Sequence, residues 1–216
     1  MKDAIYWENI IDALEKWRST APDDPSVSAI AEKYRKDAWA VLLSTILSLR
    51  TKDKVTLASS KALLDRAPAP AGFLELSVEE AERLAFPAGF YRTKVANLRK
   101  IARIILEKYN GKVPADMDAL LALPGVGRKT ANLVLIEAFD MDGICVDTHV
   151  HRICNRAGWL ISKKPDETEA ILRDILPLKF WKRINGLLVL YGQQICRPVG
   201  PRCQSCVIAT HCKRVL

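Results

Sequence analysis

The sequence predicts an all-α protein, and three observations lead to that prediction. Apolar residues recur with a helical period along nearly the whole chain, so that most segments have one apolar stripe. Residue types that cap helices stand at the ends of several of these segments. No stretch of more than four residues alternates convincingly between apolar and polar side chains, as a half-buried strand requires.

The first predicted helix has an apolar stripe formed by Trp7, Ile10, Ile11 and Leu14. Residues 37–49 are apolar nearly all round, which is typical of a helix buried on every side. Residues 67–72 read APAPAG and predict a loop. Shortly after them, Ser77 and Glu80 form a capping box, which predicts that a helix begins there.

Two later helices are predicted in the same way. Residues 98–109 have a long apolar face that stops at an Asn-Gly pair at 110–111, a sequence that favours a helix C-terminus. Asp166 with Glu169 predicts the start of another helix, and Pro177 predicts its end.

Residues 120–138 predict two helices joined by a tight hairpin, because an apolar run ends at Leu123 and helical spacing resumes at Ala131. The glycines of the intervening Pro-Gly-Val-Gly allow positive φ and close approach. Backbone N–H groups of the turn and of the next helix can therefore point at one anionic oxygen. Arg128 and Lys129 place cations at a helix N-terminus, which the helix dipole disfavours. We therefore expect a polyanion, or a reaction, at this end of the helix.

The charge balance agrees with a polyanionic partner. The chain of 216 residues has 33 Lys and Arg against 25 Asp and Glu, a net charge of +8, which by itself fits DNA, RNA or a membrane surface. No apolar run approaches the roughly 18 residues that a membrane helix needs. The N-terminal MKDAIYWENI lacks the apolar core of a signal peptide, so we expect an intracellular protein.

Residues 121–149 resemble the helix-hairpin-helix of the DNA glycosylase superfamily that includes endonuclease III. In that family the hairpin reads L-P-G-V-G, and the catalytic aspartate stands in V-D-T-H, here residues 146–149. Members that also cleave the strand have a lysine at the position of Lys129. The resemblance implies that Lys129 is a nucleophile and that Asp147 is its partner, either as proton acceptor or as stabiliser of an oxocarbenium ion. Taken singly, Lys129 also fits a solvated surface lysine and Asp147 an ordinary N-cap.

The C-terminal cysteines Cys196, Cys203, Cys206 and Cys212 have six, two and five residues between them. In a reducing compartment such a group predicts metal ligands rather than disulfides, and tetrathiolate sites hold either zinc or an iron-sulfur cluster. The full spacing resembles that of the endonuclease III family, which implies a [4Fe-4S] cluster. Cys145 and Cys154 fall outside the pattern and are expected to be buried apolar side chains.

The resemblance covers nearly the whole chain and implies two helical domains. A six-helix domain over residues 30–141 holds the hairpin and Lys129. A second domain combines residues 1–29 with residues 142–216, and holds Asp147 and the cluster. The family fold implies a catalytic cleft between the two domains.

The resemblance also implies a set of DNA contacts. An enzyme that extrudes a base must fill the gap that the base leaves. Arg50 stands where bacterial members usually have glutamine, and Phe90 stands where a leucine wedge is common, although Phe90 also fits a core aromatic. Arg197 and Arg202, between the first two cysteines, would face phosphates. The expected DNA-binding residues are Leu123, Pro124, Gly125, Val126, Gly127, Arg128, Arg50, Phe90, Arg197 and Arg202.

Together these features predict a monomeric, bifunctional DNA glycosylase and apurinic/apyrimidinic (AP) lyase of base excision repair. Its substrate would be double-stranded DNA with an oxidised pyrimidine or an abasic site. We expect a prokaryotic, cytoplasmic, nucleoid-associated protein without membrane contact. Two alternatives stay open: a thymine/uracil or adenine mismatch glycosylase, which often has tyrosine or serine at the lysine position, and a non-catalytic DNA-binding iron-sulfur protein.

Overall fold

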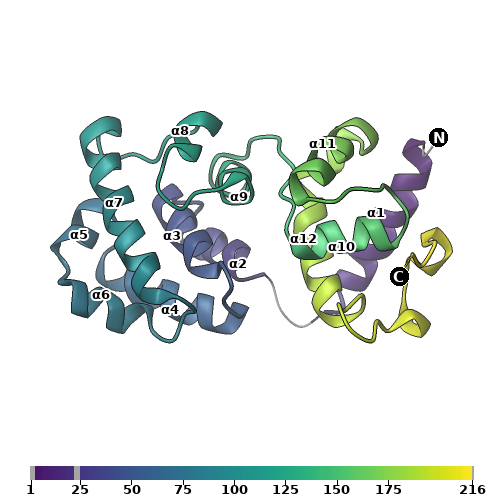
Figure 1. The fold of residues 1–216 in the computed structure, drawn as a ribbon, viewed down its shortest axis with the longest axis horizontal. Coiled ribbons are helices and arrows are strands. Elements are labelled where there is room, and N and C mark those ends of the chain that lie inside the picture. The colour runs from purple at the N-terminus through teal and green to yellow at the C-terminus, as the bar shows by residue number, and fades with distance from the viewer. Residues whose placement is uncertain (1–2, 22–24, 216) are drawn as a thin grey trace. The chain divides into compact units, whose positions relative to one another are not determined.

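The computed structural model describes residues 3–21 and 25–215, and within these residues every regular element is a helix (Figure 1). The all-α prediction is therefore confirmed. The chain divides into two compact units, Pro25–Met141 and the combination of Met1–Asp24 with Asp142–Leu216. We call them the central unit and the terminal unit. The central unit begins at Pro25 rather than at residue 30, a position that lies inside its first helix.

The helices of the central unit surround one buried helix, α3 (Ala38–Ser48), which packs against α2, α4, α7 and α9. Its residues from Trp39 to Leu47 are all buried, as the apolar run predicted. Asp37 caps its N-terminus by accepting a hydrogen bond from the N–H of Ala40 at 2.8 Å. The other helices are α2 (Ser26–Lys33), α4 (Asp53–Arg66), α5 (Pro70–Glu75), α6 (Val78–Ala85), α7 (Tyr91–Tyr109), α8 (Met117–Leu121) and α9 (Arg128–Phe139).

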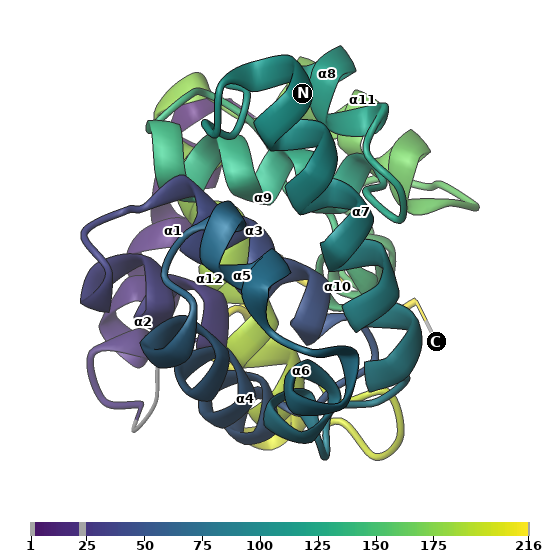
Figure 2. The same ribbon diagram turned by 90° about the vertical axis from the view of Figure 1, so that its left-hand side faces the viewer.

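The long helix α7 packs against the short helices α5 and α6, as Figure 2 shows. The predicted capping box is confirmed, because the Ser77 hydroxyl accepts a hydrogen bond from the N–H of Glu80 at the start of α6. The predicted end of α7 is confirmed as well. Asn110 and Gly111 have φ values of 50° and 78°, a left-handed conformation that ends a helix.

Two predictions about helix starts were wrong, and proline is the reason in both cases. Residues 67–72 are not wholly a loop, because α5 begins at Pro70. Helix α11 begins at Pro165, one residue before the predicted Asp166. The first helical position needs no N–H donor and suits the fixed φ of proline, so a proline there starts a helix instead of preventing one.

The terminal unit has a single core in which the predicted stripe Trp7, Ile10, Ile11 and Leu14 is fully buried. Its helices are α1 (Ala4–Arg18), α10 (Thr148–Arg156), α11 (Pro165–Ile175) and α12 (Trp181–Gln194), with the 3-10 helices η1 (Leu178–Phe180), η2 (Cys203–Ser205) and η3 (Ala209–His211). Helix α12 packs against both α1 and α10. None of the helices in the described ranges is long and apolar enough to span a membrane.

Candidate functional site

The hairpin between α8 and α9 is a tight turn that only glycine can complete. The N–H of Val126 donates to the carbonyl of Leu123 at 3.1 Å, with Pro124 and Gly125 as the central residues. Gly125 has φ +77°, which is the requirement for the third residue of a type II turn. A Cβ at this position would also lie 2.6 Å from the Asn97 side-chain nitrogen. The fold of the central unit therefore explains Gly125 without any ligand.

Gly127 has no such explanation within the fold. It is the N-cap of α9 with φ −98° and ψ 177°, values that any residue adopts. An added Cβ would meet no atom within 4 Å in the part of the chain that the structure describes. The side chains of Leu123 and Val126 are buried, whereas Gly127 and Arg128 are exposed. The outward face of the hairpin is thus bare backbone at a helix N-terminus, which is the arrangement that binds a phosphate.

Lys129 is the second residue of α9 and is half-buried, between the exposed Arg128 and the buried Thr130. It therefore follows the bare face of the hairpin within one helical turn.

Asp147 lies in the terminal unit, where it is the N-cap of α10. Its Oδ1 accepts hydrogen bonds from the N–H groups of His149 at 2.8 Å and of Val150 at 3.0 Å. Because both bonds use Oδ1, capping does not engage Oδ2. The chain before Asp147 is buried, and the Asn185 side chain donates to the carbonyl of Cys145 at 3.0 Å. Two hydrogen bonds therefore orient the carboxylate at the end of a buried segment.

The two predicted gap fillers lie together in the central unit. The guanidinium carbon of Arg50 is 5.8 Å from the centre of the Phe90 ring, within cation–π range. Both residues have φ 54°, a left-handed conformation that costs non-glycine residues about 1–2 kcal/mol. Phe90 is 64% exposed, so the interpretation of Phe90 as a core aromatic was wrong. An exposed, strained aromatic paired with an arginine is a feature of functional surfaces.

A buried lysine close to this pair, Lys94, was not predicted from the sequence as a functional residue. Lys94 on α7 is only 6% exposed, and burial lowers the pKa of its ammonium to about 8. The sequence signal was available, since Lys94 precedes Leu98 and Ile101 by four and seven residues and so lies on the apolar face of its helix.

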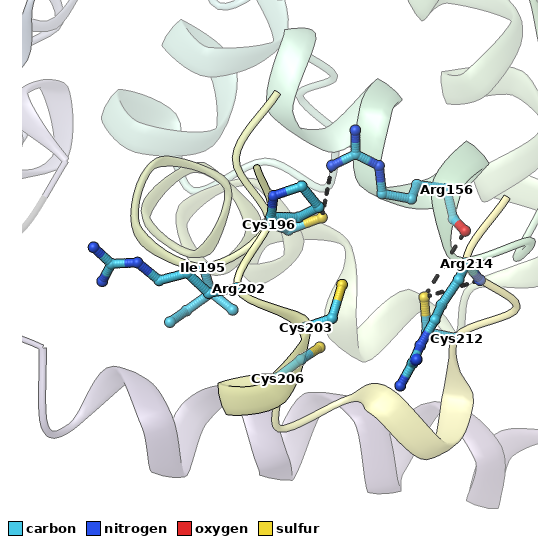
Figure 3. Close-up of a pocket in the computed structure, with 9 residues that line it drawn as sticks. Arg156, Ile195, Cys196, Arg202, Cys203, Cys206, Cys212 and Arg214 are labelled. Carbon is cyan, nitrogen blue, oxygen red and sulfur yellow. Dashed lines mark hydrogen bonds between the residues drawn. The ribbon is translucent and has the colours of Figure 1, made fainter. Parts of the chain in front are cut away.

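The four C-terminal cysteines line one cavity of about 30 Å³ in the terminal unit. Figure 3 shows their sulfur atoms facing this hollow, with the Arg156 guanidinium directed at Cys196 and the Arg202 guanidinium directed away from the cysteines. None of the four cysteines forms a disulfide. Within the described ranges, no three His, Cys, Asp or Glu side chains form a group that could hold one metal ion.

Hydrogen-bond donors point at three of these sulfurs. The Tyr191 hydroxyl donates to Cys206 Sγ at 3.2 Å, the N–H of Arg214 to Cys212 Sγ at 3.4 Å, and Arg156 Nη1 to Cys196 Sγ at 3.6 Å. Donors around sulfur stabilise thiolates, which are the form that binds metal, whereas burial raises the pKa of the Cys212 thiol. The residues present therefore fit an anionic thiolate-bound cluster.

Arginines of α10 tie the cysteine loop to the helix that Asp147 caps. Arg152 donates to the carbonyl of Cys196 at 2.8 Å and to that of Gly192 at 2.9 Å. Arg156 Nη1 donates to the carbonyl of Arg197 at 2.7 Å. Arg197 itself is half-buried and donates to Gly200 within its own loop, whereas Arg202 is exposed. Of the two loop arginines, Arg202 is the more exposed.

Comparison with known proteins places the chain among DNA repair enzymes. Residues 43–178 match the HhH-GPD superfamily of base excision DNA repair proteins. The chain is 44% identical over 177 residues to Endonuclease III of Thermotoga maritima, an alignment that covers 82% of this chain and 83% of that protein.

Two solved structures are similar in fold. One is a non-covalent Endonuclease III–DNA complex, with a TM-score of 0.81 and 30% identity over 96% of this chain and 95% of that one. The other is a trapped Endonuclease III–DNA covalent intermediate, with a TM-score of 0.76 and 34% identity over 80% and 82%. With the hairpin, the aspartate-capped helix and the four cysteines in place, the chain belongs to the endonuclease III family of base excision DNA repair proteins.

Proposed function

We propose that this protein is a bifunctional DNA glycosylase and AP lyase. It removes oxidised pyrimidines from double-stranded DNA and then cleaves the strand by β-elimination. The proposal depends mainly on the position of Lys129, which is the second residue of α9 and follows its exposed N-terminus. The same chain holds Asp147 as the N-cap of α10. The two similar structures support it, because one of those proteins is bound to DNA and the other is covalently attached to DNA.

In the proposed mechanism Lys129 attacks C1′ of the damaged nucleotide in its neutral amine form. The glycosidic bond breaks, and the base leaves with the bonding electron pair and takes up a proton. The sugar ring opens to a Schiff base on Lys129. Loss of a C2′ proton then expels the 3′ phosphate. Asp147 acts either as acceptor of the lysine proton or as stabiliser of the positive charge on the sugar, and Oδ2 is the oxygen that capping leaves for either role.

The hairpin binds backbone phosphate and reads no base. Gly127 and the first N–H groups of α9 face the phosphate, and Arg128 adds charge. Pro124 and Gly125 shape the turn, while the buried Leu123 and Val126 anchor it. Arg50 and Phe90 occupy the gap left by the extruded base, and Arg202 contacts phosphate from the cysteine loop. Arg197 braces that loop through Gly200.

Gly127→Val should weaken binding to damaged and undamaged duplexes alike, by about tenfold, because the new side chain blocks a phosphate contact and not a base contact. The slope of log affinity against log salt should become shallower by about one unit. Fluorescence anisotropy at several salt concentrations measures both quantities.

Gly186→Val on α12 is the matched control, since an added Cβ there also meets open space. It should leave DNA affinity unchanged. Melting curves should show that Gly127→Val destabilises the fold by no more than about 1 kcal/mol, the scale of an N-cap change. Weakening confined to damaged DNA would instead assign the hairpin to the base pocket.

For the cysteines we propose a [4Fe-4S] cluster held by Cys196, Cys203, Cys206 and Cys212. When bound, the cluster would supply iron–thiolate bonds that stabilise a loop with few apolar side chains of its own. The hydrogen bonds from Tyr191 and Arg156 and the surrounding arginines support an anionic occupant. Zinc is the alternative for a tetrathiolate site, and colour separates the two.

Cys206→Ser should give protein without the brown absorption near 400 nm, with much lower solubility, because one thiolate ligand, the sulfur that accepts from Tyr191, is lost. Cys154→Ala is the control: this cysteine is buried outside the cavity, so the variant should keep its colour. An absorption spectrum and an iron assay decide the point. A colourless wild-type protein that contains zinc would contradict the cluster assignment.

We further propose that the protein acts as a monomer in the cytoplasm of a prokaryotic cell, associated with the nucleoid. The net charge of +8 supports association with DNA, and the relative from Thermotoga maritima is bacterial.

A lesion panel tests the proposed activity. Single duplexes containing thymine glycol, a G·T mismatch or an A·G mismatch are incubated with the protein, and base release and strand cleavage are measured separately. We expect release together with cleavage for thymine glycol. Release at a mismatch alone would favour the mismatch alternatives. Tight binding without release from any duplex would favour a non-catalytic protein.

A further inference from the structure

The proposed mechanism makes no use of Lys94, although it is a buried cation within the described part of the central unit. Burying a lysine costs free energy unless its ammonium is fully hydrogen-bonded, so its position requires an explanation. Lys94 is too deeply buried to reach DNA itself. Its ammonium contacts, however, lie at the end of α3 and in the loop that carries Arg50, and one of them continues to the loop that carries Phe90.

The ammonium of Lys94 binds the end of α3. Its Nζ donates to the carbonyls of Leu47 at 2.7 Å and of Leu49 at 2.5 Å, and to the hydroxyl of Thr51 at 2.8 Å. Carbonyls at a helix C-terminus have no partners within the helix and carry the negative end of its dipole. The two residues on either side of Arg50 are therefore both attached to one ammonium group.

Thr51 extends this attachment to the second loop. The N–H of Gly89 donates to Thr51 Oγ1 at 3.1 Å, the same oxygen that accepts from Lys94. The loops are also in close contact, because a Cβ added to Gly89 would lie 2.7 Å from the carbonyl oxygen of Arg50. Phe90 follows Gly89 directly in the chain. The Thr51 hydroxyl therefore connects the Lys94 ammonium to the backbone of the second loop.

The hydrogen bonds of Lys94, Thr51 and Gly89 hold together the two loops whose side chains Arg50 and Phe90 form a pair. Both residues are held in a left-handed conformation that each would avoid in an unconstrained chain. Such strain persists only where the surrounding structure enforces it. Each residue also lies in a turn of its own, because the N–H of Thr51 donates to the carbonyl of Ser48 at 3.1 Å and that of Tyr91 to the carbonyl of Ala88 at 3.2 Å. The hydrogen bonds of Lys94, Thr51 and Gly89 link these two turns to each other.

We propose that Lys94 is a positioning residue for base extrusion: through Leu49, Thr51 and Gly89 it holds Arg50 and Phe90 as a preformed pair that enters the DNA. The inference rests on the proposed glycosylase function and adds to it a residue that acts without touching the substrate. It requires that Lys94 matters when a base must be extruded, and matters little when no base is present.

Two variants test the proposal. Lys94→Met keeps the length of the side chain and removes all three donors. Thr51→Val keeps the shape of its side chain and removes the shared oxygen while leaving Lys94 in place. Each should slow excision of thymine glycol by about tenfold or more, and each should slow cleavage at a preformed abasic site by less than about threefold.

Lys100→Met is the matched control, because Lys100 lies on the same helix and is exposed. It should affect neither reaction. Phe90→Ala should show the same pattern as Lys94→Met, with slower excision and nearly unchanged cleavage at an abasic site. Combining it with Lys94→Met should add little further loss, because both changes disrupt the Arg50–Phe90 pair. The fluorescence of 2-aminopurine opposite the lesion reports extrusion directly and should rise more slowly in Lys94→Met.

Equal losses in both reactions for Thr51→Val would overturn the proposal and leave Lys94 a structural residue, as would unchanged excision in Lys94→Met. If Lys94→Met fails to fold, Thr51→Val decides alone. Wild-type protein that excises no base from any duplex would contradict the proposed function itself, whatever the variants do. The two failures are therefore distinguishable.

Discussion

Lys129→Ala should reduce strand cleavage at abasic sites by at least about 10³-fold, because no other group in the proposed mechanism forms the Schiff base from which the 3′ phosphate leaves. Single-turnover cleavage of a duplex with one abasic site, followed on denaturing gels, measures the effect. DNA affinity should change little, since the hairpin and the other basic residues are retained.

Lys108→Ala provides the control for loss of a positive charge, because Lys108 is exposed in the last turn of α7, away from the hairpin. It should cleave abasic sites as the wild type does. Cleavage by Lys129→Ala at a rate near that of the wild type would mean that another amine, or water, performs the reaction. Lys129 would then be a phosphate contact.

Asp147→Asn should slow base excision by about 10²–10⁴-fold while leaving the fold intact. The intact fold and the slower excision have separate reasons. Asparagine is as good an N-cap as aspartate, so its side-chain oxygen can still accept from the N–H groups of His149 and Val150. The amide cannot, however, accept the lysine proton or stabilise a cationic sugar as a carboxylate does.

Asp147→Ala separates the two roles further. It should lose catalysis to a similar degree and should also destabilise the protein by about 1 kcal/mol, because the cap is gone. Melting temperature and excision rate, measured side by side, distinguish the variants. An Asp147→Asn protein that excises thymine glycol at the wild-type rate would show that Asp147 is only a helix cap.

Much of the fold could be predicted because its signals are local. The all-round apolar run of α3, the capping box at Ser77 and the left-handed end of α7 each depend on a few neighbouring residues. The hairpin is local as well, since a Pro-Gly pair within two apolar helices leaves few other conformations. Pro70 and Pro165 misled the prediction because proline starts some helices and breaks others.

The candidate site was less predictable wherever it depends on tertiary contacts. Nothing in the sequence brings Arg50 near Phe90, because the two residues are forty positions apart and three whole helices lie between them. The partners of Lys94 are carbonyls, which carry no residue-specific signal. Arg197 and Arg202 look alike in the sequence, yet one is bonded within its own loop and the other is exposed.

Borohydride trapping tests the central claim most directly. Wild-type protein is mixed with a duplex that contains one thymine glycol, and sodium borohydride is added during turnover to reduce any Schiff base to a stable amine. We predict a covalent protein–DNA adduct that carries the DNA on Lys129, as peptide mapping would show, and none with Lys129→Ala. Base release by the wild type without any trapped adduct would contradict the account and indicate a monofunctional glycosylase that activates water.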